Sequence, residues 1–197
     1  AVLYGLLPKA IASFLHDRGF QAGNRFFKLF AFSWPRGSSK PAFQEGHISF
    51  PEPMRITVAT PVAATLTGIA EGVLSTESVR FGNSLLRCNS VIARPSSVEK
   101  DEVSVYALSP ITCYSTLYRK TGEPYTLFHS PEEKDFGEQI HSNLVRKFLA
   151  LYPGTVPPEG KVTIIASGET REQVSRLRHD DSRPIRGWWG RFHLRGP

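Results

Sequence analysis

The chain has 197 residues, 40% of them hydrophobic, which is enough for one or two domains with cores of their own. Its 24 Lys and Arg outnumber its 18 Asp and Glu, so the net charge is +6 and the pI is about 9.5, a balance that favours a polyanionic partner such as nucleic acid. No apolar stretch is long enough to span a bilayer, no signal peptide is recognisable, and the cysteines and histidines lack metal-ligand spacing. We therefore expect a cytoplasmic protein without a membrane segment, with Cys88 and Cys113 as buried free thiols.

The first half is predicted to begin with helices and to continue with short strands around a further helix. Pro8 divides the apolar residues 1–16 into two helices, because proline fits the first turn of a helix and disrupts its interior. Gly82-Asn83 suits the tight turn of a hairpin. The predicted elements are two helices within 1–16, a helix over 61–74, and strands over 26–33, 47–50, 54–60, 79–81 and 85–93.

The second half repeats this layout after a linker candidate at 94–100, which is rich in Pro, Ser and charge. It contains a hairpin turning at Thr121-Gly122 and an amphipathic helix within 131–152. Its predicted strands cover 103–108, 113–118, 125–128, 161–167 and 185–195. We therefore expect an α+β protein of two tandem ferredoxin-like (split βαβ, RRM-like) units, an N-terminal domain over 1–94 and a C-terminal domain over 101–197.

Arginine is concentrated near the C-terminus, where residues 171–197 hold seven arginines and three acidic residues, +4 of the net +6. The alternation from Ile185 to Arg195 places Trp189, Arg191, His193 and Arg195 on one face of a strand, and Trp188, Phe192 and Leu194 on the other. The alternative is an ordinary strand with one solvated face. We favour an RNA platform on which arginines contact phosphates and Trp189 stacks on a base. Arg186 is also expected to bind RNA, and Arg171, Arg176 and Arg178 are expected to line the same groove.

Short motifs follow one another in order along nearly the whole chain. They are residues 14–17 (Phe-Leu-His-Asp), 27–33 (Phe-Lys-Leu-Phe-Ala-Phe-Ser), 48–55 (Ile-Ser-Phe-Pro-Glu-Pro-Met-Arg), 71–83, 108–112 (Leu-Ser-Pro-Ile-Thr) and 187–192 (Gly-Trp-Trp-Gly-Arg-Phe). No single motif is specific. The ordered set resembles the CRISPR repeat-RNA endoribonucleases, the sixth Cas protein family of the RAMP superfamily.

That resemblance implies a cofactor-free, metal-independent endoribonuclease that cuts CRISPR repeat transcripts. The 2′-hydroxyl of the substrate attacks, leaving a 2′,3′-cyclic phosphate and a 5′-hydroxyl. The residues at the family's catalytic positions are Tyr4, His16 and Lys28, and Arg18 and Arg25 would add cations near the scissile phosphate. A histidine can act as base or acid at neutral pH, while lysine and tyrosine can stabilise the charge that develops.

Spacing tests whether the first two of these residues can meet. Tyr4 and His16 are twelve residues apart, about 18 Å along a straight helix, so they converge only if the chain bends, and Pro8 supplies a bend. Without the resemblance, Tyr4 would be a packing residue, His16 a histidine favoured by the dipole of a helix C-terminus, and Lys28 a solvent-facing strand residue.

The resemblance also allows other functions and partners. The main alternative is a noncatalytic RAMP subunit that holds guide RNA within a CRISPR effector complex, and a remoter one is a general single-strand RNA binder. CRISPR repeat RNA is the expected partner, with an effector complex and a second copy of this chain as further partners. Family members have a strand before the first helix, and a helix, an RNA-contacting glycine-rich loop and a strand after the Arg-Gly-Pro motif. We therefore expect a fragment, or a fold completed by another chain.

Overall fold

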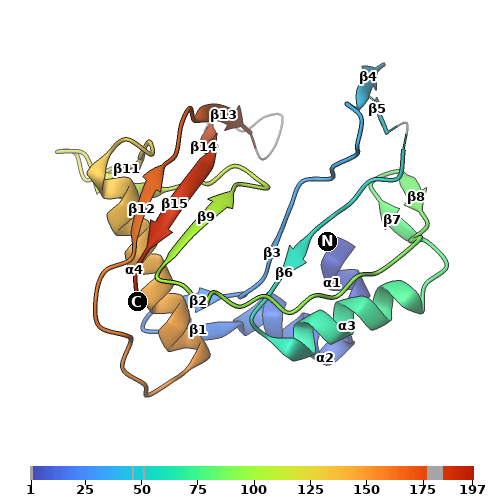
Figure 1. Ribbon diagram of the computed structural model, residues 1–197, viewed down its shortest axis with the longest axis horizontal. Coiled ribbons are helices and arrows are strands. Elements are labelled where there is room, and N and C mark those ends of the chain that lie inside the picture. Colours follow the sequence, from blue (N-terminus) through green and yellow to red (C-terminus); the bar gives the residue numbers. More distant parts are fainter. Residues whose placement is uncertain (1, 46, 51, 177–183) are drawn as a thin grey trace. The chain divides into compact units, whose positions relative to one another are not determined.

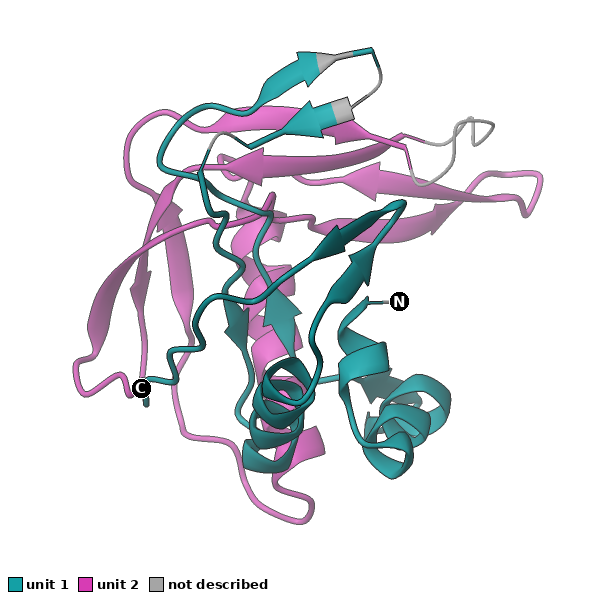
Figure 2. Ribbon diagram, turned by 90° about the vertical axis from the view of Figure 1, so that its right-hand side faces the viewer, with its two compact units in different colours: residues 1–96 teal, residues 97–197 magenta. Residues whose placement is uncertain are grey.

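The computed structural model describes residues 2–45, 47–50, 52–176 and 184–197. The chain forms two compact units, residues 1–96 and 97–197, which Figure 2 colours separately. The boundary falls within the stretch 94–100 that is rich in Pro, Ser and charge. Both units combine helices with short antiparallel strands, so the fold is of the mixed α and β type.

The first unit begins with short helical elements and continues with two-stranded antiparallel pairs and one longer helix (Figure 1). The pairs are β1 (Phe20–Ala22) with β2 (Arg25–Phe27), β3 (Ala31–Phe32) with β6 (Val58–Ala59), β4 (Ala42–Gln44) with β5 (His47–Ser49), and β7 (Val79–Phe81) with β8 (Ser84–Leu86). The helical elements are α1 (Val2–Leu6), α2 (Lys9–Ser13), the π-helical turn η1 (Phe14–Arg18) and α3 (Ala63–Leu74).

The N-terminal helices pack on α3 through two glycines. A Cβ on Gly72 would clash with the backbone carbonyl of Leu6, and a Cβ on Gly68 would lie 2.8 Å from a ring carbon of Pro8. Around this close approach, Leu7, Leu15 and Ile69 are buried and form the core of the unit. The chain turns between α1 and α2 at Pro8, where the sequence predicted a bend.

The predicted strand over 26–33 is wrong in its middle. Its first part forms a hairpin with β1, its last part is β3, and Leu29 between them has a left-handed φ of 50° that a strand does not tolerate. The buried Leu29 is held there by a hydrogen bond from Thr60 Oγ1 to its carbonyl oxygen, at 2.8 Å. The contact comes from a residue 31 positions away, so local pattern could not reveal it.

Two further predicted strands are shorter than expected. The strand over 54–60 is reduced to β6 and an isolated bridge between Arg36 and Arg55. Between β3 and this bridge the register shifts by one residue, so that Trp34 and Pro35 oppose Ile56 in a bulge that interrupts the ladder. The strand over 85–93 ends with β8 at Leu86, because only its first residues pair with β7.

In the second unit, α4 (Lys134–Leu151) lies along one face of a three-stranded sheet (Figure 1). The sheet has the order β12 (Thr163–Ala166), β15 (Arg191–Arg195), β9 (Glu102–Tyr106), and β15 is antiparallel to both neighbours. Phe136 of α4 and Phe192 of β15 are fully buried, with ring centroids 6.1 Å apart. Two hairpins complete the unit, β10 (Tyr114–Tyr118) with β11 (Pro124–Phe128), and β13 (Arg171–Ser175) with β14 (Ile185–Trp189).

The predicted single strand over 185–195 is also wrong. β14 pairs with β13, whereas β15 joins the three-stranded sheet, so the chain changes sheets at Gly190. A Cβ at Gly190 would lie 3.1 Å from the methyl group of Thr170, which leaves little room for a side chain at this crossing. Within β15 the expected alternation holds, since Phe192 is buried and Arg191 and Arg195 are exposed.

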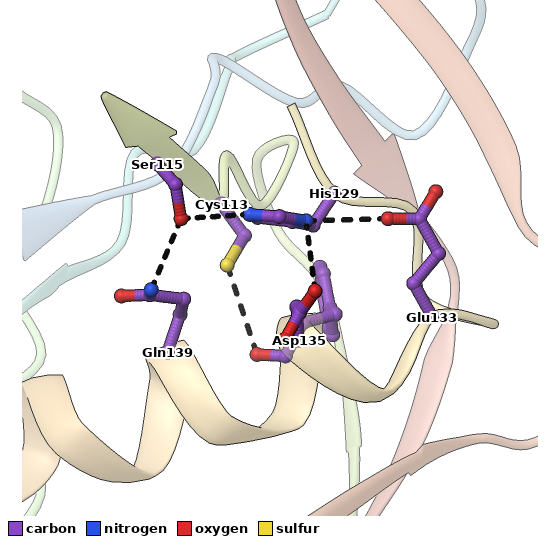
Figure 3. A network of polar contacts seen from close by, with 7 residues as sticks. Cys113, Ser115, His129, Glu133, Asp135 and Gln139 are labelled. Atoms are coloured by element: carbon purple, nitrogen blue, oxygen red, sulfur yellow. Dashed lines mark hydrogen bonds and ion pairs between the residues drawn. The ribbon is translucent and has the colours of Figure 1, made fainter. Parts of the chain in front are cut away.

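A polar network ties the β10–β11 hairpin to the start of α4 (Figure 3). The ring of His129 is 3% exposed and hydrogen-bonds through Nε2 to Ser115 Oγ at 2.9 Å and through Nδ1 to the Glu133 carboxylate at 3.2 Å. Gln139 Nε2 donates to the same Ser115 Oγ at 3.1 Å. Because both ring nitrogens have partners, burial of this imidazole is compatible with a stable core.

The two cysteines differ in exposure and in predicted reactivity. Cys113 is buried as expected, but the same expectation is wrong for Cys88, which is exposed. Burial, reinforced by the negative charges of Asp135 and Glu133, raises the pKa of the Cys113 thiol to about 11. Because only the thiolate reacts, we expect an aromatic disulfide reagent to label Cys88 rapidly at mildly alkaline pH and Cys113 only after unfolding. Cys88→Ser is the control, and a rapidly labelled thiol in that variant would contradict the prediction.

Candidate catalytic site and RNA-binding surface

Tyr4, His16 and Lys28 lie together in the first unit. The rings of Tyr4 in α1 and His16 in η1 meet edge to face, with centroids 6.0 Å apart. Lys28, directly after β2, donates a hydrogen bond from Nζ to the carbonyl oxygen of His16 at 2.7 Å. The turn between α1 and α2 is what brings Tyr4 back to His16.

Gly19 explains how β2 comes close enough to η1 for Lys28 to reach His16. Gly19 follows η1 with φ 75° and ψ −164°, a conformation that is essentially restricted to glycine. A Cβ at this position would lie 2.5 Å from the carbonyl oxygen of Phe27 and 3.3 Å from Cδ of Lys28. The absence of a side chain therefore allows the chain to reverse directly and to place Lys28 against the π-helical turn, a type of turn that is frequent at functional sites.

The imidazole of His16 is oriented by its neighbour and open to solvent. Its Nδ1 lies 2.7 Å from Oδ1 of Asp17, and the two side chains are 76% and 66% exposed. A carboxylate can only accept, so in the neutral ring the proton is on Nδ1 and the lone pair is on Nε2. Tyr4, His16 and Asp17 line an open depression of about 250 Å³ together with Ala12 and Ser13.

Arg18 and Arg25 are both exposed and flank these residues in the chain, Arg18 at the end of η1 and Arg25 at the start of β2. Within the part of the chain that the structure describes, neither makes an ion pair or a side-chain hydrogen bond. Their charges are therefore not neutralised by neighbouring carboxylates of this unit.

The predicted RNA-binding residues of the second unit are divided between two sheets. Trp189 on β14 is half-buried, donates from Nε1 to Gln173 Oε1 at 2.6 Å, and has the guanidinium of Arg171 6.0 Å from its ring centroid. It therefore does not share a face with β15, contrary to our expectation. Arg186 on the same strand lies 3.3 Å from the carboxylate of Glu172. Arg178 lies outside the described residues.

On β15, two of the three predicted cations contact one carboxylate. Glu102 lies 3.4 Å from Nε2 of His193 and 3.2 Å from Nε of Arg195. Arg191 is exposed and makes no ion pair with any residue that the structure describes. Sequence reasoning missed Glu102, because it is 93 positions away from Arg195 in the chain and becomes its neighbour only through the pairing of β9 with β15.

The described residues form neither a metal-binding cluster nor a membrane-spanning helix. No three His, Cys, Asp or Glu side chains in those ranges come together as a metal ion would require. Of the helices in the described chain, none is long and apolar enough to cross a bilayer.

Several solved structures share the arrangement of helices and sheets of this chain, and so its fold. One, described as the product of a Cas6-related gene from Pyrococcus furiosus, aligns with a TM-score of 0.77 at 17% identity over 99% of this chain and 75% of its own. Another, described as CRISPR associated protein Cas6, aligns with a TM-score of 0.74 at 18% identity, over 100% of this chain and 77% of its own. A third, described as a RAMP protein binding different RNA substrates, aligns with a TM-score of 0.74 at 15% identity, over 99% of this chain and 76% of its own. No curated protein sequence matches.

The sequence identifies the family. The model of the family described as CRISPR associated protein Cas6, C-terminal, matches residues 93–197, more than half of the chain. The chain therefore belongs to the Cas6 family of CRISPR-associated proteins, as its ordered motifs predicted. This places it among proteins that bind and process CRISPR RNA.

Proposed function

We propose that the chain is an endoribonuclease that cuts CRISPR repeat transcripts without a metal ion, leaving a 2′,3′-cyclic phosphate and a 5′-hydroxyl. The proposal is carried by the contacts of His16 with Tyr4 and Lys28, and by the open depression that Tyr4 and His16 line. Membership of the Cas6 family supports repeat RNA as the substrate.

In-line attack by a 2′-hydroxyl needs a base, an acid for the leaving 5′-oxygen, and positive charge near the phosphorane oxygens. His16 is placed for proton transfer, since the hydrogen bond between Nδ1 and Asp17 leaves Nε2 available. The ammonium of Lys28 is anchored 2.7 Å from the His16 carbonyl and supplies the charge. Tyr4, whose ring lies against the imidazole edge to face, contributes its hydroxyl as a hydrogen-bond donor.

The proposal extends to the fold of each unit. In the second unit, β9, α4 and β12 form a βαβ unit whose two strands are separated by β15, which is the split βαβ arrangement of a ferredoxin-like fold. In the first unit, α3 likewise lies in the chain between two strands, β6 and β7, which pair with β3 and β8 in separate sheets. We therefore propose two tandem ferredoxin-like domains, over 1–94 with the catalytic residues and over 101–197 with RNA-binding strands.

We propose that Arg18 and Arg25, which are close to His16 and Lys28 in the chain, and Arg191 of the second unit contact the RNA backbone. An exposed Arg without an acidic partner suits this role, because its planar fork can bind a phosphate through two hydrogen bonds. Arg191 meets that condition among the described residues, whereas Arg186, His193 and Arg195 have carboxylates as neighbours. Trp189, whose Nε1 donates to Gln173 and whose ring contacts Arg171, is proposed to stack on a base.

The test is an incubation of repeat-containing RNA with the protein in excess EDTA. We expect cleavage at one position per repeat, with a cyclic phosphate on the upstream fragment, because the proposed groups are all side chains. An RNA with a single 2′-deoxynucleotide at the cut site should bind with equal affinity and stay intact. Binding without any cutting would instead support the noncatalytic RAMP subunit, and cleavage of the deoxy-substituted RNA would contradict the mechanism.

A further inference from the structure

The sheet face that points away from α4 carries a row of side-chain pairs between β9 and β15. In an antiparallel pair of strands, hydrogen-bonded and non-hydrogen-bonded residue pairs alternate. Backbone hydrogen bonds from Ala107 N to Gly190 O (3.0 Å) and from Gly196 N to Asp101 O (2.9 Å) show which pairs between β9 and β15 are hydrogen-bonded. The pairs on the open face therefore occupy the non-hydrogen-bonded positions, where opposite side chains come closest. We call them the open-face pairs: Tyr106 with Arg191, Ser104 with His193, and Glu102 with Arg195.

The intervening residues of β15 point into the core, which establishes the direction of the open-face pairs. Phe192 is fully buried, and Leu194 packs against the same cluster as Phe136 of α4. Since successive side chains of a strand alternate, Arg191, His193 and Arg195 project from the opposite surface of the sheet. This surface is the one that a nucleic acid could approach.

At one end of the row, the carboxylate of Glu102 offsets the positive charge of Arg195. Glu102 is the single carboxylate among the open-face pairs, and its oxygens lie 3.2 Å from Arg195 Nε and 3.4 Å from His193 Nε2. The other ring nitrogen of His193 lies 3.1 Å from Ser104 Oγ. A phosphate approaching this end would have to displace Glu102 from Arg195 and would meet a negative charge beside it.

The other end of the row has the opposite character. Arg191 is exposed and has no carboxylate partner among the residues described, and the side chain across from it, Tyr106, is 54% exposed. A guanidinium next to an aromatic ring matches two neighbouring parts of a nucleotide, the phosphate and the base face. The two ends of the row therefore differ in charge and in chemistry, although the sequence of β15 places an arginine at each.

We infer that this sheet binds RNA through its Tyr106–Arg191 end, and that Glu102 withholds Arg195 and His193 from the RNA backbone. The inference rests on the proposed function only in that the chain must bind RNA. It assigns unequal roles to Arg191 and Arg195, which the alternation of the sequence makes equivalent. It also assigns to Glu102 a role against binding, as a carboxylate that confines phosphate contacts to one end.

The experiment compares the two arginines as matched variants. Each of Arg191→Ala, Arg195→Ala and Glu102→Gln is made in the full chain carrying His16→Ala, so that bound RNA stays intact. Affinity for a fluorescein-labelled single-stranded CRISPR repeat RNA is measured by anisotropy over a range of salt concentrations. Loss of one phosphate contact lowers the salt slope by about 0.7, which corresponds to about fivefold in affinity near 0.1 M salt. We expect this loss for Arg191→Ala and a change of less than about twofold for Arg195→Ala.

Glu102→Gln should act in the opposite direction, because it removes the competing charge while keeping the size of the side chain. We expect about fivefold tighter binding and a slope that increases by about 0.7, as Arg195 becomes available to phosphate. Arg191→Lys keeps the charge and should keep most of the slope. Equal losses for the two arginine variants, or unchanged binding for Glu102→Gln, would overturn the inference and leave RNA binding intact. Absence of binding by the His16→Ala parent chain would overturn both.

Discussion

Replacing His16 by alanine is expected to lower the rate constant of repeat-RNA cleavage by about 10²- to 10⁴-fold, the usual contribution of a positioned general acid or base. RNA affinity and the free energy of unfolding should change little, because the imidazole is 76% exposed and its contacts are Asp17 and the edge of Tyr4. Single-turnover cleavage with excess protein measures the chemical step, and anisotropy measures binding separately.

Two conservative changes around His16 sharpen this prediction. Asp17→Asn keeps the size of the side chain but allows its amide to donate to Nδ1, which shifts the ring proton to Nε2 and should lower the rate with binding unchanged. Tyr4→Phe keeps the ring that packs on His16 and Phe30 and removes only the hydroxyl. If His16→Ala cleaved at the rate of the unaltered chain, the assignment of this depression as the catalytic site would be wrong.

The parts of the fold that could be predicted depend on local chemistry. Pro8 separates α1 from α2, and glycine-containing turns at Gly82-Asn83 and Thr121-Gly122 close the two expected hairpins, because each effect acts within a few residues. The strand breaks at Leu29 and Gly190 could not be predicted in this way. At Leu29 the hydrogen bond comes from Thr60, 31 positions away, and at Gly190 the room for a side chain is limited by Thr170, 20 positions away.

The same distinction applies to the candidate sites. Tyr4, His16 and Lys28 were selected by resemblance, and the structure places them within contact, but their proximity depends on Gly19, which no motif had singled out. The electrostatics of β15 depend on Glu102 across the sheet, so the charge pattern of the strand alone overstates its free cations. Pairing register, rather than composition, decides which arginines can contact an anion.

Gly19→Ala is expected to lower the free energy of unfolding by about 2–6 kcal/mol, the sum of a conformational and a steric cost. Its φ of 75° and ψ of −164° disfavour any residue with a Cβ by about 1–3 kcal/mol. The new Cβ would also lie 2.5 Å from the Phe27 carbonyl oxygen, and relieving such overpacking costs about 1–3 kcal/mol more. Urea denaturation, followed by circular dichroism, measures the change.

Gly23→Ala is the matched control, since Gly23 is in the adjacent hairpin turn with φ 57° but has no atom within 4 Å of the position of a Cβ. It should lose only about 1–2 kcal/mol, the cost of a left-handed conformation. The rate of RNA cleavage by the two variants then distinguishes a loss of stability from a displacement of Lys28. At a temperature where both variants are folded, Gly19→Ala should cleave slowly, because relief of the clash moves β2 and Lys28 away from His16, while Gly23→Ala should cleave normally. Equal cleavage by the two variants would show that Lys28 does not need Gly19 to reach its place.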